Sequence, residues 1–160
     1  MNFRTTFKIE PLSQKIKIQD IVLLLGSCFS EHIGNKIQEA KFDTFSNPFG
    51  VLFNPISIFN LLNKEMKKDF FEDNYIENKG IWYNYNLHSK ISNPSIEVLK
   101  KNVNQKYKET QTHLSKSKHI LLTFGTAFVY SLKDKKKVIA NCQKMPANLF
   151  VKRLLTVGEI

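Results

Sequence analysis

Two short runs of apolar residues, each ended by a glycine, form the clearest pattern along the chain. Residues 20–25 read Asp-Ile-Val-Leu-Leu-Leu before Gly26, and residues 119–124 read His-Ile-Leu-Leu-Thr-Phe before Gly125. Unbroken apolar runs of this length are typical of strands that are buried on both faces of a parallel sheet. We therefore predict two central strands, each followed by a tight turn.

Helical spacing follows the first of these runs and precedes the second. Ile33, Ile37 and Ala40 are spaced by four and three, which predicts a helix of about three turns with Ser30 as its N-cap and Glu31 in its first turn. A second helix is expected from Ile56 to about Lys68. The longest helix opens at Asn-Pro-Ser 93–95 and carries one apolar face: Ile96, Leu99, Val103, Tyr107, Thr110 and Leu114.

The other segments carry weaker patterns. We expect a short strand at 43–46, a Pro- and Gly-containing loop at 47–50, an aromatic-rich insertion at 70–93 with a strand pair at 81–86, a hairpin formed by 128–132 and 138–140, and a new amphipathic pattern over 149–160.

The alternation of strands and helices predicts one α/β domain over 1–160 with a mainly parallel sheet. Ligands of such sheets bind at the carboxyl ends of the strands, which puts Gly26-Ser27-Cys28 and Gly125-Thr126 at one rim.

Charge does not change this interpretation. The 24 Lys and Arg residues exceed the 14 Asp and Glu residues, for a net charge of +10, but they are scattered along the chain. Their one compact run, at 133–137, surrounds Asp134 and is typical of a solvated hairpin turn. We therefore expect no nucleic-acid partner.

The chain also lacks the sequence signs of export or membrane insertion. Residues 1–20 contain no apolar run of signal-peptide length, and no run approaches the length of a membrane span. We expect a cytoplasmic protein with no membrane partner, in which Cys28 and Cys142 are free thiols. Its oligomeric state stays open.

The turn at 26–28 is the main candidate for chemistry. Ser27 and Cys28 are both nucleophile types, and the helix that follows offers free N–H groups and a partial positive charge to a developing oxyanion. A structural interpretation explains the same residues: Gly26 ends the strand, Ser27 satisfies a turn N–H and Cys28 is a small buried side chain. Spacing alone leaves both interpretations open.

Four blocks of residues favour the chemical interpretation of this turn over the structural one. They are Leu-Gly-Ser-Cys-Phe-Ser at 25–30, Asn-Pro-Phe-Gly-Val-Leu-Phe-Asn-Pro-Ile-Ser at 47–57, Leu-Thr-Phe-Gly-Thr-Ala-Phe-Val-Tyr at 122–130 and Val-Ile-Ala-Asn-Cys-Gln-Lys at 138–144. In order and spacing the chain resembles the GSCFA-domain family over nearly its whole length. It departs in having Ser30 where the family name has alanine, and Gln143 falls within the Asn-Cys-x-Lys block.

The resemblance implies a relative of the SGNH, or GDSL-like, hydrolases with a three-layer α/β/α fold. Matching glycine to glycine puts Cys28 at the nucleophile position, whereas matching by chemistry makes Ser27 the nucleophile. We prefer Ser27 and keep Cys28 as a candidate. Backbone and side-chain groups that would hold the oxyanion or the substrate are expected at Gly26, Asn47, Gly50, Gly125, Thr126 and Asn141.

The resemblance also implies what this chain should lack. SGNH hydrolases carry their acid and base in a late Asp-x-x-His element, and no Asp of this chain has a His three positions on. Family members continue past the point that matches Ile160, so the base is expected there, with His88 as the best alternative. The resemblance implies ester hydrolysis or acyl transfer on a small-molecule or carbohydrate ester, and we expect no cofactor. We also expect no metal, because the His and Cys residues are not spaced as ligand pairs. The rival hypothesis is a non-catalytic binding domain on the same scaffold.

Overall fold

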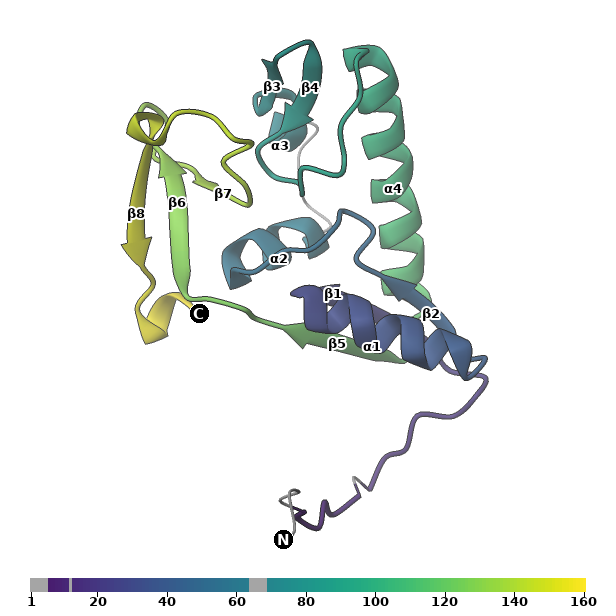
Figure 1. Cartoon of the computed structure of the whole chain (residues 1–160). Helices are drawn as coiled ribbons and strands as arrows, with labels where there is room; N and C mark the ends of the chain where they lie inside the picture. The colour runs from purple at the N-terminus through teal and green to yellow at the C-terminus, as the bar shows by residue number, and fades with distance from the viewer. Residues whose placement is uncertain (1–5, 12, 64–68) are drawn as a thin grey trace, which may run out of the picture.

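The computed structural model describes residues 6–11, 13–63 and 69–160, which form a mixed α/β structure. Figure 1 shows the order and arrangement of its elements. They are β1 (Ile21–Gly26), α1 (Cys28–Glu39), β2 (Asp43–Ser46), α2 (Pro55–Leu62), α3 (Asp69–Glu72), β3 (Tyr75–Asn78), β4 (Ile81–Asn84), α4 (Ile96–Lys116), β5 (His119–Thr123), β6 (Phe128–Leu132), β7 (Val138–Ile139) and β8 (Phe150–Leu154), with short 3-10 turns at Ala147–Leu149 and Val157–Glu159.

The central element is a parallel sheet in the order β2-β1-β5. In β1, Leu23 pairs with Phe45 of β2 and with Ile120 of β5, and Gly26 pairs with Thr123 at the carboxyl end of β5. Both strands predicted from glycine-ended apolar runs are therefore confirmed as neighbours. Their carboxyl ends meet at one rim, as parallel pairing requires.

Alternate residues of β1 face different helices. A Cβ placed on Gly34 of α1 would lie 3.8 Å from Leu24, so Leu24 faces α1. Leu23 and Leu25 point the other way into the main core. That core also holds apolar side chains of α2, α4 and the connecting loops: Phe49, Leu52, Ile58, Leu61, Phe71, Leu87, Leu99 and Val103.

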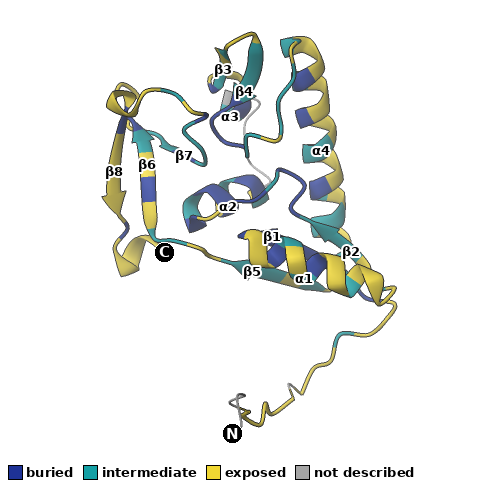
Figure 2. Ribbon diagram, in the orientation of Figure 1, coloured by how far each residue is buried: buried dark blue, intermediate teal, exposed yellow. Residues whose placement is uncertain are grey.

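The longest predicted helix is confirmed as α4. Ser95 is its N-cap, where its Oγ accepts from the N–H of Val98, and Leu99, Val103 and Thr110 are buried along one face. Figure 2 shows that this buried stripe turns toward α2 and β4, while the outer side of α4 is exposed. An amphipathic helix stabilises a domain mainly through such a stripe.

Two antiparallel sheets flank the parallel one. The 70–93 segment contributes to α3 and forms the β3–β4 pair. A strand pair was predicted within 81–86, but only β4 lies there, and its partner β3 begins earlier, at Tyr75. The predicted hairpin is β6–β7, and β8 joins β6 on its other edge. The side chains of Tyr85, Leu132, Ile139 and Phe150 form a second core cluster between these sheets.

Three expectations differ from the structure or lie outside the described residues. Helix α2 ends at Leu62, and residues 64–68 lie outside the described part. The first helix begins at Cys28 and not after Ser30, so the N-cap prediction was wrong. The 149–160 segment contains strand β8. In the described part of the chain, none of the helices combines the length and hydropathy needed to span a bilayer.

Candidate functional site

The site begins with a glycine that no other residue can replace without movement. Gly26 has φ of +141°, and a Cβ at this position would lie 2.1 Å from the carbonyl oxygen of Thr123. Its N–H donates to Oδ1 of Asn47 at 2.8 Å. The end of β1 therefore lies directly against the end of β5 and against the loop that follows β2.

Ser27 is the N-cap of α1 and its side chain is buried. Its Oγ accepts from the N–H of Phe29 at 3.3 Å, and only 8% of the residue is exposed. The sequence predicted Ser30 as the N-cap, because Ser30 comes just before the helically spaced apolar residues Ile33, Ile37 and Ala40. The N-cap is instead Ser27 and the helix starts at Cys28, which places Ser30 inside its first turn with 1% exposure.

A chain of hydroxyl groups holds Ser27 in place. Oγ of Ser27 lies 3.0 Å from Oγ1 of Thr123, and Oγ of Ser30 lies 2.7 Å from the same atom. Ser30 Oγ also donates to the carbonyl oxygen of Leu25 at 3.2 Å. One proton order satisfies all three groups: Ser27 donates to Thr123, Thr123 donates to Ser30, and Ser30 donates to Leu25. The Ser27 hydroxyl is thus fully engaged inside the protein.

Cys28 has the opposite surroundings. It is the first residue of α1, its thiol is free, and the residue is exposed. Within the described ranges, its backbone N–H donates to no acceptor, as is usual for the first residues of a helix. Together with the helical residues that follow it, Cys28 lines an open hollow of about 500 Å³, whose other lining residues are Phe29, Glu31, His32 and Asn35. The turn therefore carries an exposed free cysteine whose backbone N–H has no acceptor among the described residues.

Asn47 and Gly50 belong to the loop that supports this turn. Besides accepting from Gly26, Asn47 donates through Nδ2 to the carbonyl oxygen of Ser27 at 3.4 Å. Gly50 has φ of +76°, and its N–H donates to the carbonyl oxygen of Asn47 at 2.8 Å. Asn47 is placed as a brace of the backbone. The oxyanion role expected for the Gly50 N–H stays a prediction, because this N–H is engaged in the loop itself.

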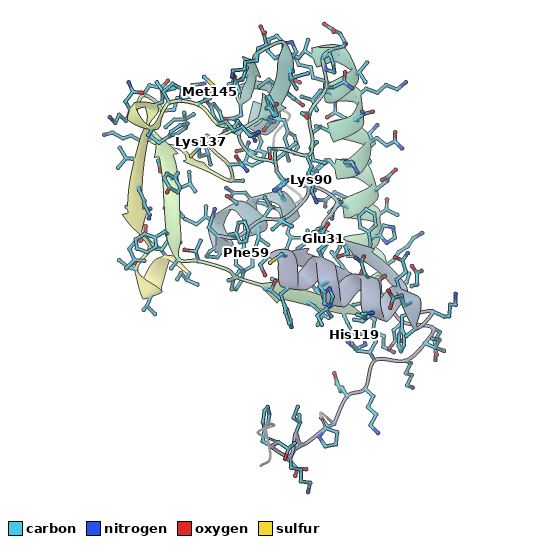
Figure 3. The ribbon with its side chains drawn as sticks, in the orientation of Figure 1. Glu31, Phe59, Lys90, His119, Lys137 and Met145 are labelled. Carbon is cyan, nitrogen blue, oxygen red and sulfur yellow. The ribbon has the colours of Figure 1, made fainter. Side chains whose placement is uncertain are left out.

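His88 lies against the same loop. A Cβ on Gly50 would lie 2.4 Å from Cβ of His88, and the His88 N–H donates to the carbonyl oxygen of Phe49 at 3.1 Å. Two residues on, Nζ of Lys90 lies 3.8 Å from Oε1 of Glu31, in the first turn of α1. Figure 3 shows Lys90 directly beside Glu31. The loop that carries His88 is therefore held next to the turn that carries Cys28.

Burial sets the ionisation of His88. Partial burial lowers the pKa of its imidazole, Lys90 lowers it further, and Glu31 acts in the opposite direction. Its Nδ1 accepts a hydrogen bond from the N–H of Lys90 at 3.1 Å. The imidazole is thus mainly neutral at neutral pH, with Nδ1 occupied as an acceptor.

The last three predicted site residues, Gly125, Thr126 and Asn141, lie outside the turn at 26–28 and outside the loops of Asn47 and His88. The N–H groups of Gly125 and Thr126 both donate to the carbonyl oxygen of Phe53, at 2.8 and 3.2 Å, directly after β5. Asn141 follows β7, and its Oδ1 accepts from the N–H of Gln143 at 2.8 Å. The structure thus gathers Gly26, Ser27, Cys28, Asn47, Gly50 and His88, and it gives Asn141 contacts with the loop before His88.

Two residues of this site had no role in the sequence-based prediction. Thr123 is the polar end of the second apolar run, a position that could have indicated a contact with the rim. Gln143 lies in the Asn-Cys-Gln-Lys block, and it is 1% exposed with two strong hydrogen bonds. In the described part of the chain, no three His, Cys, Asp or Glu side chains gather as metal ligands.

Comparison with known proteins decides the family. The model of the GSCFA family matches residues 21–160, which include β1, the turn and every later element. The chain belongs to the GSCFA family. No match was found among curated proteins or solved structures. Within this GSCFA domain, the Gly-Ser-Cys-Phe letters of the family name are the strand end, the N-cap and the first two helical residues at 26–29.

Proposed function

We propose that this GSCFA domain is an SGNH-like hydrolase or acyl-transfer domain that acts on an ester, with Cys28 as its nucleophile. One observation carries the proposal: of the two nucleophile types at the turn, only Cys28 is exposed, whereas the oxygen of Ser27 is enclosed by hydroxyl groups. This revises the preference for Ser27, and it agrees with the alignment of glycine to glycine. We keep the remaining site residues as expected from the sequence, with Asn47 as a brace.

The chemistry follows from the first turn of α1. The thiol of Cys28 loses its proton to solvent water, its sulfur attacks the ester carbonyl carbon, and the π electrons of the carbonyl move to the carbonyl oxygen. The free N–H of Cys28 and the positive end of α1 stabilise this negative charge. The tetrahedral intermediate collapses with loss of the alkoxide, which takes a proton from water, and a second water hydrolyses the thioester or an acceptor alcohol takes the acyl group.

The layers around the sheet support the SGNH-like assignment. Helix α1 covers one face of β1, and α2 and α4 cover the face of Leu23 and Leu25. The turn lies at the carboxyl end of the first strand, where α/β enzymes bind their ligands. A free-thiol nucleophile is compatible with a reducing compartment, and a cytoplasmic location is therefore part of this proposal.

Turnover of p-nitrophenyl acetate and butyrate tests the proposal. We expect Cys28→Ala to abolish hydrolysis above the uncatalysed rate and Ser27→Ala to retain it with reduced stability. Cys142→Ala is the matched control, because Cys142 is the other free thiol and its partial burial raises the pKa of that thiol. Full activity in Cys28→Ala, or equal losses in Cys28→Ala and Cys142→Ala, contradicts the assignment.

A second function, ligand binding without catalysis, has its own structural support. An open hollow of about 430 Å³ lies between β3 and the end of β6, and two of its walls are tyrosine side chains, Tyr75 and Tyr85. Aromatic walls with a few charged groups are typical of small-molecule sites. Saturable binding of a sugar or peptide at this hollow, without any reaction at Cys28, would favour this second function.

A further inference from the structure

The segment that leads to His88 is held by hydrogen bonds from several directions. The N–H of Tyr85 donates to the carbonyl oxygen of Asn74 at 3.0 Å, and the carbonyl oxygen of Tyr85 accepts from the N–H groups of Ala140 and Asn141 at 2.9 and 3.1 Å. Residues 84–87 are buried as well. This part of the chain is a fixed support, although it has no regular secondary structure beyond the end of β4.

Gln143 completes the support from inside. Its Nε2 donates to the carbonyl oxygen of Asn84 at 2.7 Å and to that of Leu87 at 2.8 Å, so both amide hydrogens are used. The backbone of Gln143 adopts a φ of +54°, which is uncommon for a residue other than glycine. A single buried amide therefore fixes both ends of the turn that comes directly before His88.

The hydrogen bond at Nδ1 determines which nitrogen of His88 carries the proton. Because the Lys90 N–H donates to Nδ1, the neutral ring has its proton on Nε2. A general base needs a free lone pair on a ring nitrogen, and in this tautomer the only lone pair, on Nδ1, already accepts from the Lys90 N–H. The charged groups around the ring are Lys90 on its own loop and Glu31 on α1.

We propose that His88 is fixed beside the first turn of α1 as a neutral hydrogen-bond donor through Nε2–H, and that Gln143 is the residue that positions it. The inference rests on the proposed function, because it gives the Nε2–H a role toward the oxyanion formed there. In this role His88 transfers no proton during attack. It adds a second donor to the free N–H of Cys28, and it replaces the base role expected for His88 from the sequence.

Nitrogen NMR of ¹⁵N-histidine-labelled protein tests the tautomer directly. The chain has four histidines, so the His88→Gln spectrum assigns the His88 signals. We expect one fixed tautomer with an unprotonated Nδ1 and a protonated Nε2. Lys90→Pro removes the N–H donor and should produce a mixture of tautomers, whereas Lys90→Ala removes the charge, keeps the N–H and should keep the tautomer. A proton on Nδ1, or a mixture in the unmodified protein, overturns the inference.

The positioning role of Gln143 has a separate test. Gln143→Met keeps the length of the side chain and removes both donors, so the His88 tautomers should mix and its pKa should move toward the ordinary value of 6.5. Thr110→Val is the matched control, because Thr110 is equally buried but lies on α4. Unchanged His88 signals in folded Gln143→Met overturn the positioning role. If that variant fails to fold, the Lys90 pair still decides the tautomer, and Gln143→His, which keeps one donor, decides the positioning role by the same signals.

These readouts separate the inference from the proposed function. They follow the ring of His88 and do not depend on any reaction of Cys28. An inert Cys28 with a fixed Nε2–H tautomer contradicts the proposed function alone, whereas an acylated Cys28 with a mixed His88 tautomer contradicts the inference alone.

Discussion

The hydroxyl group of Thr123 gives the sharpest test of how the turn is built. Thr123→Val keeps the branched shape that suits β5 and removes the one atom shared by Ser27 and Ser30. Ser30 keeps its bond to the carbonyl oxygen of Leu25, and the N–H of Ser27 keeps its bond to the carbonyl oxygen of Thr123 at 3.1 Å. The hydroxyl of Ser27 is the one group that loses its acceptor.

The size of the effect follows from that single unpaired group. A buried donor without a partner costs about 2 kcal/mol, and the added half-buried methyl group returns about 0.4 kcal/mol. We therefore expect Thr123→Val to lower the free energy of unfolding by about 1.5 kcal/mol. Ser27→Ala removes the N-cap and should cost about 1 kcal/mol. In the double variant no unpaired hydroxyl is left, so its total cost should be about 1 kcal/mol and not the sum of about 2.5 kcal/mol.

Urea unfolding followed by far-UV circular dichroism measures these free energies for the two single variants and the double variant. Thr112→Val is the matched control: Thr112 is exposed on α4, and its replacement should change stability by less than about 0.5 kcal/mol. Additive costs in the double variant, or a cost of Thr123→Val no larger than that of the control, would refute the hydroxyl chain and with it the enclosed state of Ser27.

Two further predictions concern backbone conformation and pH. Gly26→Ala should cost more than about 2 kcal/mol, because the new Cβ would meet a backbone oxygen at positive φ, whereas Gly80→Ala, with positive φ and no atom within 4 Å, should cost about 1 kcal/mol in the same unfolding assay. The N–H of Lys17, with help from His119 and Lys118, lowers the pKa of Asp20 from 3.8 to about 2. This carboxylate therefore stabilises the fold above about pH 4, and the contribution is lost as the pH falls from 3.8 toward 2. When the midpoint of urea unfolding is measured as a function of pH, Asp20→Asn should show a smaller decrease between pH 3.8 and 2 than the unmodified protein. An equal decrease in both proteins would show that Asp20 does not contribute.

Local patterns carried most of the fold prediction. The run that became β1 is apolar because both faces of this strand are buried, and burial of that kind is visible in a single stretch of sequence. The similar run that became β5 was predicted to be buried in the same way, but β5 lies at the end of the order β2-β1-β5 and its residues are half-buried or exposed, with Ile120 44% exposed. Helix α4 was equally clear, since apolar positions recur by three and four residues from Ile96 to Leu114, and Leu99 and Val103 among them are buried. Strand β8 was not recognised because four of its five residues are exposed, so its sequence shows no alternation.

The site could be predicted only in part, because its decisive contacts are distant in sequence. Ser27 and Thr123 are 96 residues apart, and Gln143 and Asn84 are 59 residues apart. No spacing rule along the chain links such pairs. The choice between Ser27 and Cys28 depended on which side chain Thr123 encloses. The N-cap choice between Ser27 and Ser30 depended on where the helix begins, at Cys28.

The central claim is tested most directly by identifying the residue that carries a trapped acyl group. The full chain is incubated with an activated ester, quenched in acid, digested and mapped by peptide mass spectrometry. The structure predicts that the acyl group lies on Cys28, with Ser27 unmodified and Cys142 modified far more slowly. An acyl group on Ser27, or equal modification of Cys28 and Cys142, would contradict the claim that the turn after β1 presents a reactive sulfur.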